Sequence, residues 1–396
     1  LFLVVFFMLI FLSILVTLAL FLLVVVVHEL GHFLAARSVG VRVREFWIGI
    51  PPKAKILWKD RYGTQYTLNW LPIWGFVRLE WETPEERWPK SLRSKSLFAK
   101  IWVLIMGIVF NFLFAWFVFS GLFFAGVAPL MIHNSHLPFE RTSLLFPSFT
   151  QAQQSWFISA SGVVLNPLDW GPAMQSGIAS GSILLAVNWI TVSSPDHALK
   201  EVAAAGNKSL LRVSQSGSIQ AFSVEKDDKG RIQSYISWKN LDYNKDFLYK
   251  MSFFESIQAG FWETYDQIVI SGESLGTIAK RIVAPKNAEE RTEAVESLGG
   301  PIAAWKWVHS LIVWNVEIQI YIIFAALLSI SIGFFNLLPF PALDGGRIVE
   351  ESFASLLKMF GISPKKYEYI AQHYHGFGFL LLMLLSVLIA FKDIFW

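Results

Sequence analysis

The chain has 396 residues, of which 54% are apolar and only 16% are charged, whereas about a quarter of a soluble globular protein is charged. This composition excludes a disordered chain and an ordinary cytosolic enzyme, and it favours a membrane protein with at least one domain in water. The net charge of +3 gives no indication of nucleic-acid binding, and the absence of cysteine excludes disulfides, thiolate metal sites and a cysteine nucleophile.

Four apolar segments predict transmembrane helices, because a helix needs about 20 apolar residues to cross the bilayer. The first carries no charge and is interpreted as a retained helix rather than a cleaved signal peptide. The segments are residues 1–27, 101–127, 318–338 and 377–390.

Charge predicts the orientation of these helices. Residues 37–100 hold 13 Lys and Arg against 6 Asp and Glu, and short loops with such a basic excess lie on the cytoplasmic side. The N-terminus and residues 128–310 are therefore expected outside, and residues 341–371 inside again.

The long outer segment changes character along its length. Residues 160–240 contain short apolar runs broken by turn residues, as at 183–187, which predicts a small β domain. Residues 247–283 show apolar side chains at spacings of three and four, typical of an amphipathic helix on the membrane surface or against a neighbouring domain. Residues 284–297 are charged and polar and are interpreted as a linker.

The chain therefore divides into four predicted parts. These are residues 1–127 with two transmembrane helices and a membrane-dipping β loop at about 38–100, 128–246 with the outer domain at about 160–240, 247–310 with the interfacial helix and linker, and 311–396 with the last two transmembrane helices.

The first predicted helix ends in His28-Glu29-Leu30-Gly31-His32. Positions four apart share a helix face, so both imidazoles can meet one metal ion, and Glu29 can reach a water bound to it. Ionisable groups at the end of an apolar run are costly at membrane depth, and they usually serve a function. The pattern predicts a zinc site in which Glu29 takes a proton from water.

Asp344 is the candidate for the third protein ligand that such a site needs. It follows the third predicted transmembrane helix, at the cytoplasmic end where the two histidines also lie. Gly345 and Gly346 are expected to allow a sharp backbone turn there. The alternative is a helix-terminating turn with a solvated Asp344. His373 and His375 lie on the same side and could also bind metal, but they are interpreted as interfacial residues.

Four motifs together resemble the site-2 protease family of intramembrane zinc metalloproteases, in its bacterial form with one PDZ-like domain. Residues 28–32 match the family's H-E-x-x-H and residues 107–111 its G-x-x-x-N, while residues 336–339 and 343–345 match N-x-x-P and L-D-G. They occur in the family's order on three predicted spans, so the joint match is more specific than any one motif.

The resemblance implies a polytopic α-helical membrane protein with about four transmembrane helices, a small membrane-associated β region and an extracytoplasmic PDZ-like α+β domain. It also implies that His28, His32 and Asp344 bind zinc and that Glu29 is the catalytic base. Residues implied to lie near the substrate or the developing oxyanion are Asn111, Asn336, Gly49, Gly75, Phe76 and Pro339. For the asparagines, the alternative is an interhelical hydrogen bond.

The cytoplasmic loop is similar to the family's β region, with two departures. Residues 46–49 resemble F-S-I-G with Trp47 in place of a small polar residue, and residues 71–78 resemble L-P-x-G-G-Y-V-K with Trp74 in place of a glycine. In relatives this region forms a small sheet that dips into the membrane, where an edge strand can pair with an unwound substrate. The alternative is an ordinary cytoplasmic hairpin lying on lipid.

Residues 171–184 resemble a segment of PDZ domains, with Ser182 where aspartate is usual. The resemblance implies one such domain, which screens out substrates with bulky outer parts; the alternative is a spacer without peptide affinity. Residues 298–302 resemble the family's S-G-P-I-G element and are expected to begin a helix.

The implied function is zinc-dependent cleavage, in the bacterial inner membrane, of transmembrane segments of single-span proteins already trimmed by another protease. Anti-sigma factors and signal-peptide remnants are examples of such substrates. The expected partners are these substrates and the lipid bilayer, with no nucleic acid. The alternative from another class is a membrane adaptor with a peptide-binding PDZ-like domain and a structural metal site, while an outward-facing zincin is opposed by the position of residues 28–32 on the basic side.

Overall fold

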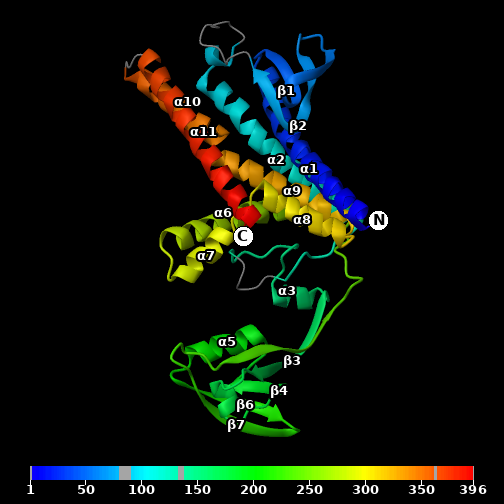
Figure 1. Ribbon diagram of the computed structural model, residues 1–396, viewed down its shortest axis with the longest axis vertical. Helices are drawn as coiled ribbons and strands as arrows, with labels where there is room; N and C mark the ends of the chain where they lie inside the picture. The colour runs from blue at the N-terminus through cyan, green and yellow to red at the C-terminus, as the bar shows by residue number, and fades with distance from the viewer. Residues whose placement is uncertain (1, 80–90, 133–137, 361–363, 396) are drawn as a thin grey trace. The chain divides into compact units, whose positions relative to one another are not determined.

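The computed structural model describes residues 2–79, 91–132, 138–360 and 364–395. The chain forms two compact units, which can be followed by colour in Figure 1. The helical unit comprises Leu1–Pro129, Ser135–Leu145 and Tyr249–Trp396, and the β unit comprises Leu130–Asn134 and Phe146–Leu248.

Four helices of the helical unit are long and apolar enough to cross a membrane, which confirms the four predicted spans. They are α1 (Phe2–Ser38), α2 (Leu97–Ala125), α9 (Ile318–Leu337) and α11 (Pro364–Phe395), the last with its apolar part at Gly376–Phe395. α2 packs against both α1 and α9 (Figure 1), so the second span fixes the first and third relative to each other.

Shorter helices connect these spans. α6 (Phe253–Val283) confirms the amphipathic helix predicted within 247–283, and a capping box of Ser252 and Glu255 begins it. The segment 284–297 is not the plain linker that was expected, because the side chain of Asn287 caps a helix there. The remaining elements are η1 (Leu92–Ser94), α7 (Ala288–Glu296), α8 (Pro301–Val313) and α10 (Asp344–Met359).

α8 packs against α1 and supplies a hydrogen-bond partner for a polar residue of the first span. The indole Nε1 of Trp305 donates to Oγ of Ser13 at 2.9 Å, and Oγ1 of Thr17 donates to the carbonyl of Ser13 at 2.7 Å. Ser13 is fully buried. Both hydroxyls thus find partners inside the protein, as they must where no water is present.

The predicted β region consists of two long paired strands, β1 (Val43–Lys59) and β2 (Gln65–Leu79). Residues 45–48 pair with 75–78 on one side and with 65–68 on the other, so the strands fold back into a compact sheet. Phe33 of α1 packs with Phe46 of β1 in a shared apolar core. This core fixes the sheet to the end of α1; residues 80–90 of the predicted loop lie outside the described part of the chain.

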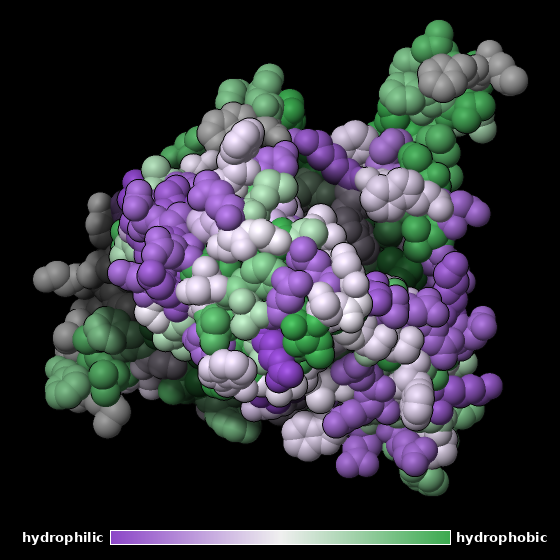
Figure 2. Space-filling view, turned by 90° about the horizontal axis from the view of Figure 1, so that it is seen from below, coloured by the Kyte–Doolittle hydropathy of each residue, from purple (hydrophilic) through white to green (hydrophobic). Residues whose placement is uncertain are grey.

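The β unit is the predicted α+β domain, an antiparallel sheet in the order β7-β6-β4-β3-β8 with β5 paired to β4. Its core comes from the inward side chains of the sheet together with Ala198 and Val202 of α5. Hydrophilic side chains gather over much of the face of this unit that Figure 2 shows. Its elements are α3 (Phe149–Gln154), β3 (Ile158–Pro167), α4 (Pro172–Gln175), β4 (Ser182–Val187), β5 (Ile190–Thr191), α5 (Pro195–Ala204), β6 (Lys208–Gln215), β7 (Ser218–Glu225) and β8 (Ser234–Tyr243).

Candidate metal centre

The helices α1 and α2 approach each other closely beside His28 and His32. A Cβ atom added to Gly31 would lie 2.2 Å from the carbonyl oxygen of Met106, and one added to Gly107 would lie 2.4 Å from Nε2 of His32. Glycine is therefore needed at both positions for the helices to pack this tightly. The packing role of Gly31 is one that the sequence does not reveal.

Three side chains converge at this contact, as the sequence predicted. Nε2 of His28 lies 3.0 Å from Oδ2 of Asp344, Nε2 of His32 lies 3.2 Å from the same oxygen, and the two Nε2 atoms are 3.1 Å apart. The three side chains are only 9%, 11% and 13% exposed for His28, His32 and Asp344. His373 is exposed on α11 and is not part of this cluster, and the side chain of His375 lies outside the described part of the structure.

The geometry of this triad fits a zinc ion. Atoms bound to one tetrahedral zinc at about 2.1 Å lie about 3.4 Å from one another, close to the three separations observed here. Nδ1 of His32 lies 2.8 Å from the carbonyl oxygen of Val103. A carbonyl can only accept, so Nδ1 carries the proton and the lone pair of Nε2 faces the other two ligands. Three protein ligands leave a fourth position for water or substrate, as in catalytic zinc sites.

Asn111 of α2 completes the surroundings of His28. Its amide lies 3.3 Å from Nδ1 of His28, and its buried Oδ1 has no hydrogen-bond partner in the described part of the chain. The two ends of an amide have the same shape, and with the amide turned over Oδ1 accepts from Nδ1–H of His28. That bond leaves Nε2 of His28 free to bind a cation, so the orphaned oxygen is further support for a metal in the triad.

Asp344 reaches the triad from the first turn of α10, not from the glycine turn that the sequence predicted. Ala342 makes the turn instead, with a φ of 72°. Gly345 and Gly346 are needed for close packing, because a Cβ atom on them would lie 2.3 and 2.1 Å from the carbonyl oxygens of Leu338 and Phe340. The alternative of a solvated Asp344 is wrong, since the side chain is largely buried.

An ion pair joins α2 to α10, the helix that begins at Asp344. Nζ of Lys100 lies 2.7 Å from Oε2 of Glu351, and the two side chains are only 13% and 20% exposed. Sequence patterns do not reveal this pair, because the partners are 251 positions apart and each resembles an ordinary surface charge. The contact holds α10, and with it Asp344, against the helix that carries Asn111.

Glu29 lies on α1 next to His28 and is half-buried. It is near enough to His32 to interact with it electrostatically. Glu29 therefore lies on the same helix as the two imidazoles and close to both, which is consistent with the position predicted for a base beside the metal.

Asn336 and Pro339 lie at the end of α9 and just beyond it. Nδ2 of Asn336 donates to the carbonyl of Ile332 at 3.0 Å, which ties this side chain to its own helix. Pro339 is exposed. The two predicted asparagines thus differ, because Asn111 is hydrogen-bonded to His28 of the triad and Asn336 to its own helix.

Gly49, Gly75 and Phe76 lie in the β1–β2 sheet. Gly49 has a φ of 94°, and its carbonyl accepts a hydrogen bond of 2.7 Å from Nδ2 of Asn69. Gly75 and Phe76 pair through their backbones with β1. The three predicted residues therefore share one small sheet, anchored on the helix that carries both histidines.

The chain is similar to known proteins over nearly its whole length. The sequence pattern of the family described as peptidase family M50 matches residues 16–385. A protein of Clostridium perfringens named "Putative zinc metalloprotease" is 29% identical over an alignment of 374 positions, which covers 93% of this chain and 95% of that protein. A Helicobacter pylori protein of the same name is 27% identical over an alignment of 350 positions, which covers 83% of this chain and 85% of that protein. The "Regulator of sigma E protease" of Haemophilus influenzae is 23% identical over an alignment of 445 positions, which covers 93% of this chain and 95% of that protein.

Proposed function

This chain belongs to peptidase family M50 and is an intramembrane zinc metalloprotease, and on that premise we propose which residues carry its activity. His28, His32 and Asp344 hold the zinc ion, and Glu29 is the catalytic base. The observation that supports this assignment is the nearly equilateral triangle of two Nε2 atoms and one carboxylate oxygen, with sides of 3.0, 3.1 and 3.2 Å.

Peptide hydrolysis here needs a base that takes a proton from water, a Lewis acid that polarises the scissile carbonyl, and a proton donor for the leaving amine. Zinc, when bound, makes water more acidic and polarises the scissile carbonyl. Glu29 takes the proton from the attacking water and then delivers it to the amine nitrogen. Its half-buried position on α1 suits a carboxylate that must meet both water and substrate.

Asn111 and the carbonyl of Val103 act as positioning groups for the two imidazoles. Each accepts a hydrogen bond from Nδ1–H of one histidine, at 3.3 Å for His28 and 2.8 Å for His32. This leaves both Nε2 lone pairs available in one direction. Both groups belong to α2, so this helix orients the ligands that α1 supplies.

The edge of β2 is the proposed place for the substrate strand. Residues 75–79 pair with β1 on one side, and in the described part of the chain no strand pairs with them on the other. A helix conceals its carbonyls from attack, so a substrate helix must unwind before it is cut, and an extended segment can pair with a free strand edge. Gly75 and Phe76 lie on this edge, which supports their assignment to substrate binding.

The basic excess of residues 37–100 supports a metal centre on the cytoplasmic side of a bacterial inner membrane, with the β unit, interpreted as PDZ-like, on the outer side. The Haemophilus relative is named as a regulator of sigma E. We take this as support for substrates that are single-span regulatory membrane proteins, trimmed on the outer side before this cut.

The substitution Glu29→Gln tests the proposal against the membrane-adaptor alternative. The purified variant should keep its zinc, measured by plasma mass spectrometry, but fail to cleave a tagged single-span substrate. Treatment of the wild type with a divalent-metal chelator should remove activity, and added zinc should restore it. A Glu29→Gln protein that cleaves at the wild-type rate would overturn the assignment of the base.

A further inference from the structure

The β unit exposes a group of large apolar and aromatic side chains that the proposed proteolysis does not use. Two of them lie where the chain enters and leaves this unit, and the others lie close to these two in the fold. We call the group the junction patch. Its members are Met131, Trp156, Leu241, Tyr243 and Leu248, which are 44%, 81%, 40%, 48% and 49% exposed.

Contacts between aromatic rings bring three members of the patch together. The ring of Phe157 lies 5.9 Å from that of Tyr243 and 5.6 Å from that of Phe247. Trp156 precedes Phe157 in the chain, and Leu248 follows Phe247. The exposed side chains of Trp156, Tyr243 and Leu248 therefore surround one cluster of rings.

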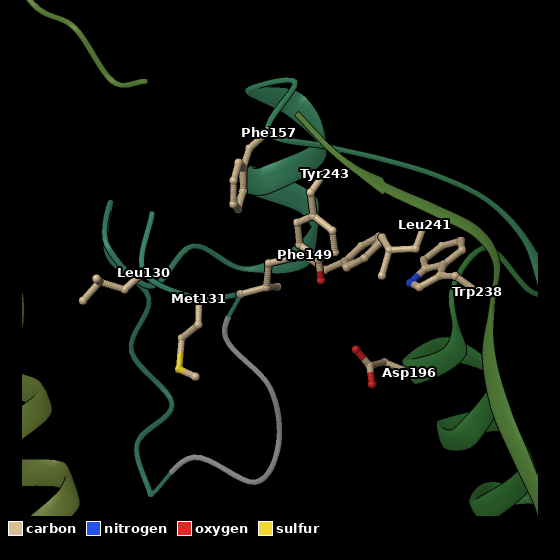
Figure 3. Close-up of a pocket in the computed structure, with 9 residues that line it drawn as sticks. Leu130, Met131, Phe149, Phe157, Asp196, Trp238, Leu241 and Tyr243 are labelled. Atoms are coloured by element: carbon tan, nitrogen blue, oxygen red, sulfur yellow. The ribbon is translucent and has the colours of Figure 1, made fainter. Parts of the chain in front are cut away.

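A cavity of about 540 Å³ connects the other two members to the same rings. Met131 and Leu241 line it together with Phe157 and Tyr243. Figure 3 shows Met131 across this cavity from the rings of Phe157 and Tyr243. All five members of the junction patch thus border one part of the β unit.

Backbone hydrogen bonds place the chain that follows the patch beside the end of a membrane span. The amide of Tyr249 donates to the carbonyl of Val127 at 2.8 Å, and the amide of Met251 donates to the carbonyl of Phe123 at 2.9 Å. Phe123 belongs to α2, a candidate span that ends at Ala125. Tyr249 therefore lies near the level at which the hydrocarbon core of the bilayer gives way to headgroups.

The connection between the patch and this level is short. The amide of Asn244 donates to the carbonyl of Phe157 at 2.9 Å, which fixes residue 244 beside the ring cluster. Five residues lead from Asn244 to Tyr249, and five fully extended residues span at most about 18 Å. The junction patch therefore stays within reach of the bilayer interface whatever the orientation of the β unit.

We propose that the junction patch inserts into the headgroup region of the bilayer beside α2 and holds the β unit on the membrane surface. Tryptophan and tyrosine are enriched at this level, because their rings are apolar while the N–H or O–H group still meets water. The aliphatic members add apolar area that lipid covers. The short connection favours lipid over a separate protein, because the bilayer is always close to the patch.

This role depends on α2 crossing the membrane, and it is independent of the residues proposed to hold zinc. Trp170 provides a matched control for Trp156. Both are highly exposed, at 81% and 87%, and both have a left-handed backbone, with φ of 65° and 62°. Trp156 lies just before β3 and Trp170 just after it, so the two side chains are at opposite ends of one strand. An effect of exposure alone would be the same for both.

Because the chain contains no cysteine, a small fluorescent label can be attached at one chosen position of the full-length protein. Gln154→Cys and Asp169→Cys place the label at exposed positions near Trp156 and Trp170, respectively. The proteins are studied in phosphatidylcholine nanodiscs, in which some lipids carry a nitroxide quencher on the headgroup. We expect the lipid quencher to act about threefold more strongly on the label at position 154, and iodide in water to act more strongly at position 169.

Trp156→Asn in the protein labelled at position 154 tests the anchor itself. Asparagine tolerates a left-handed backbone, so this change removes the ring without straining the turn. Quenching by lipid should fall by about half and quenching by iodide should rise, because the β unit then leaves the surface more often. Trp170→Asn, the matched control, should change neither.

Equal quenching by lipid at the two label positions would overturn the proposal, as would no quenching by lipid at position 154. Protection of that label from iodide without quenching by lipid would show that a protein surface, not the bilayer, covers the patch. Unchanged quenching in Trp156→Asn would also refute the anchoring role. If Trp156→Asn loses its thermal transition and so does not fold, the two label positions in the otherwise unchanged protein still decide the question.

Discussion

Nε2 of His28 lies 3.0 Å from Oδ2 of Asp344, although 316 positions separate the two residues along the chain. His28 is near the end of α1, and Asp344 follows shortly after the end of α9. α2 contacts α1 and also α10, the helix that carries Asp344, so the separation of these two side chains is set by helix packing. Changes in that packing should therefore alter zinc affinity even where they leave the three ligands intact.

Gly107→Ala should abolish zinc binding and activity, because the added Cβ atom would lie 2.4 Å from Nε2 of His32. Gly121→Ala is the matched control: it lies on the same helix, and nothing lies within 4 Å of an added Cβ atom. We expect the control to keep its full zinc content and activity. Metal analysis of the purified variants checks this, and equal zinc contents would contradict the packing argument.

The spans and the clustering of His28, His32 and Asp344 could be predicted from the sequence because their signals are local or carried by short motifs. An uncharged run predicts α1 whatever surrounds it, and His28 and His32 share a helix face by spacing alone. The motif around Asp344 adds the third member of the cluster, although the sequence did not reveal that Asp344 begins a helix. The turn falls at Ala342, and both following glycines lie against backbone carbonyls of the segment that leads into the turn.

Contacts between distant segments could not be predicted in the same way. Ser13 looks like an isolated polar residue in an apolar helix until Trp305 of α8 is placed beside it. Asp196 of α5 and Trp238 of β8 line the same cavity of the β unit, although no periodic pattern in the sequence relates the two positions. Only the register of strands and the packing of helices bring such residues together.

Asn111→Leu should lower zinc affinity by about 10- to 100-fold, because His28 then loses the acceptor for its Nδ1 proton. Asn111→Asp should keep most of the affinity, since a carboxylate also accepts from Nδ1–H. Competition with a metal indicator dye measures both affinities. If Asn111 served only the substrate or the oxyanion, Asn111→Leu would lower the cleavage rate with zinc affinity unchanged, and that result would refute the positioning role.

The Lys100–Glu351 pair should contribute to stability as a unit. Lys100→Met or Glu351→Gln leaves one largely buried charge without its partner and is expected to cost about 3 kcal/mol of unfolding free energy. Exchange of the two residues, Lys100→Glu with Glu351→Lys, should recover most of this loss. Denaturant unfolding in detergent measures these proteins together with the double variant Lys100→Met with Glu351→Gln, and additive single losses in that double-mutant cycle would show that the two groups do not interact.

A buried carboxylate fixes the segment before the β unit to α6. Oε1 of Glu263 accepts hydrogen bonds from Ser143 Oγ at 2.9 Å and Gln267 Nε2 at 2.7 Å, and Oε2 accepts one from the amide of Leu144 at 2.9 Å. Burial raises the pKa of Glu263 to about 7 in spite of these three donors, and the charge of Asp266 acts in the same direction. α6 is not one of the four candidate spans, so pH changes in water can reach this group.

The protein should therefore lose stability as the pH rises from 4.5, the ordinary pKa of a glutamate side chain, to about 7. In this pH window the folded state keeps a proton that the unfolded state releases. The free energy of unfolding therefore falls by at most about 1.4 kcal/mol for each pH unit. Above about pH 7 Glu263 is ionised in both the folded and the unfolded state, so its effect on the free energy of unfolding no longer changes with pH. Glu263→Gln cannot ionise and should flatten this part of the profile, whereas Glu289→Gln, an exposed position on α7, should leave it unchanged. Thermal unfolding in detergent across this pH range measures the slope, and parallel profiles for the wild type and Glu263→Gln would show that the buried carboxyl is not the group that titrates.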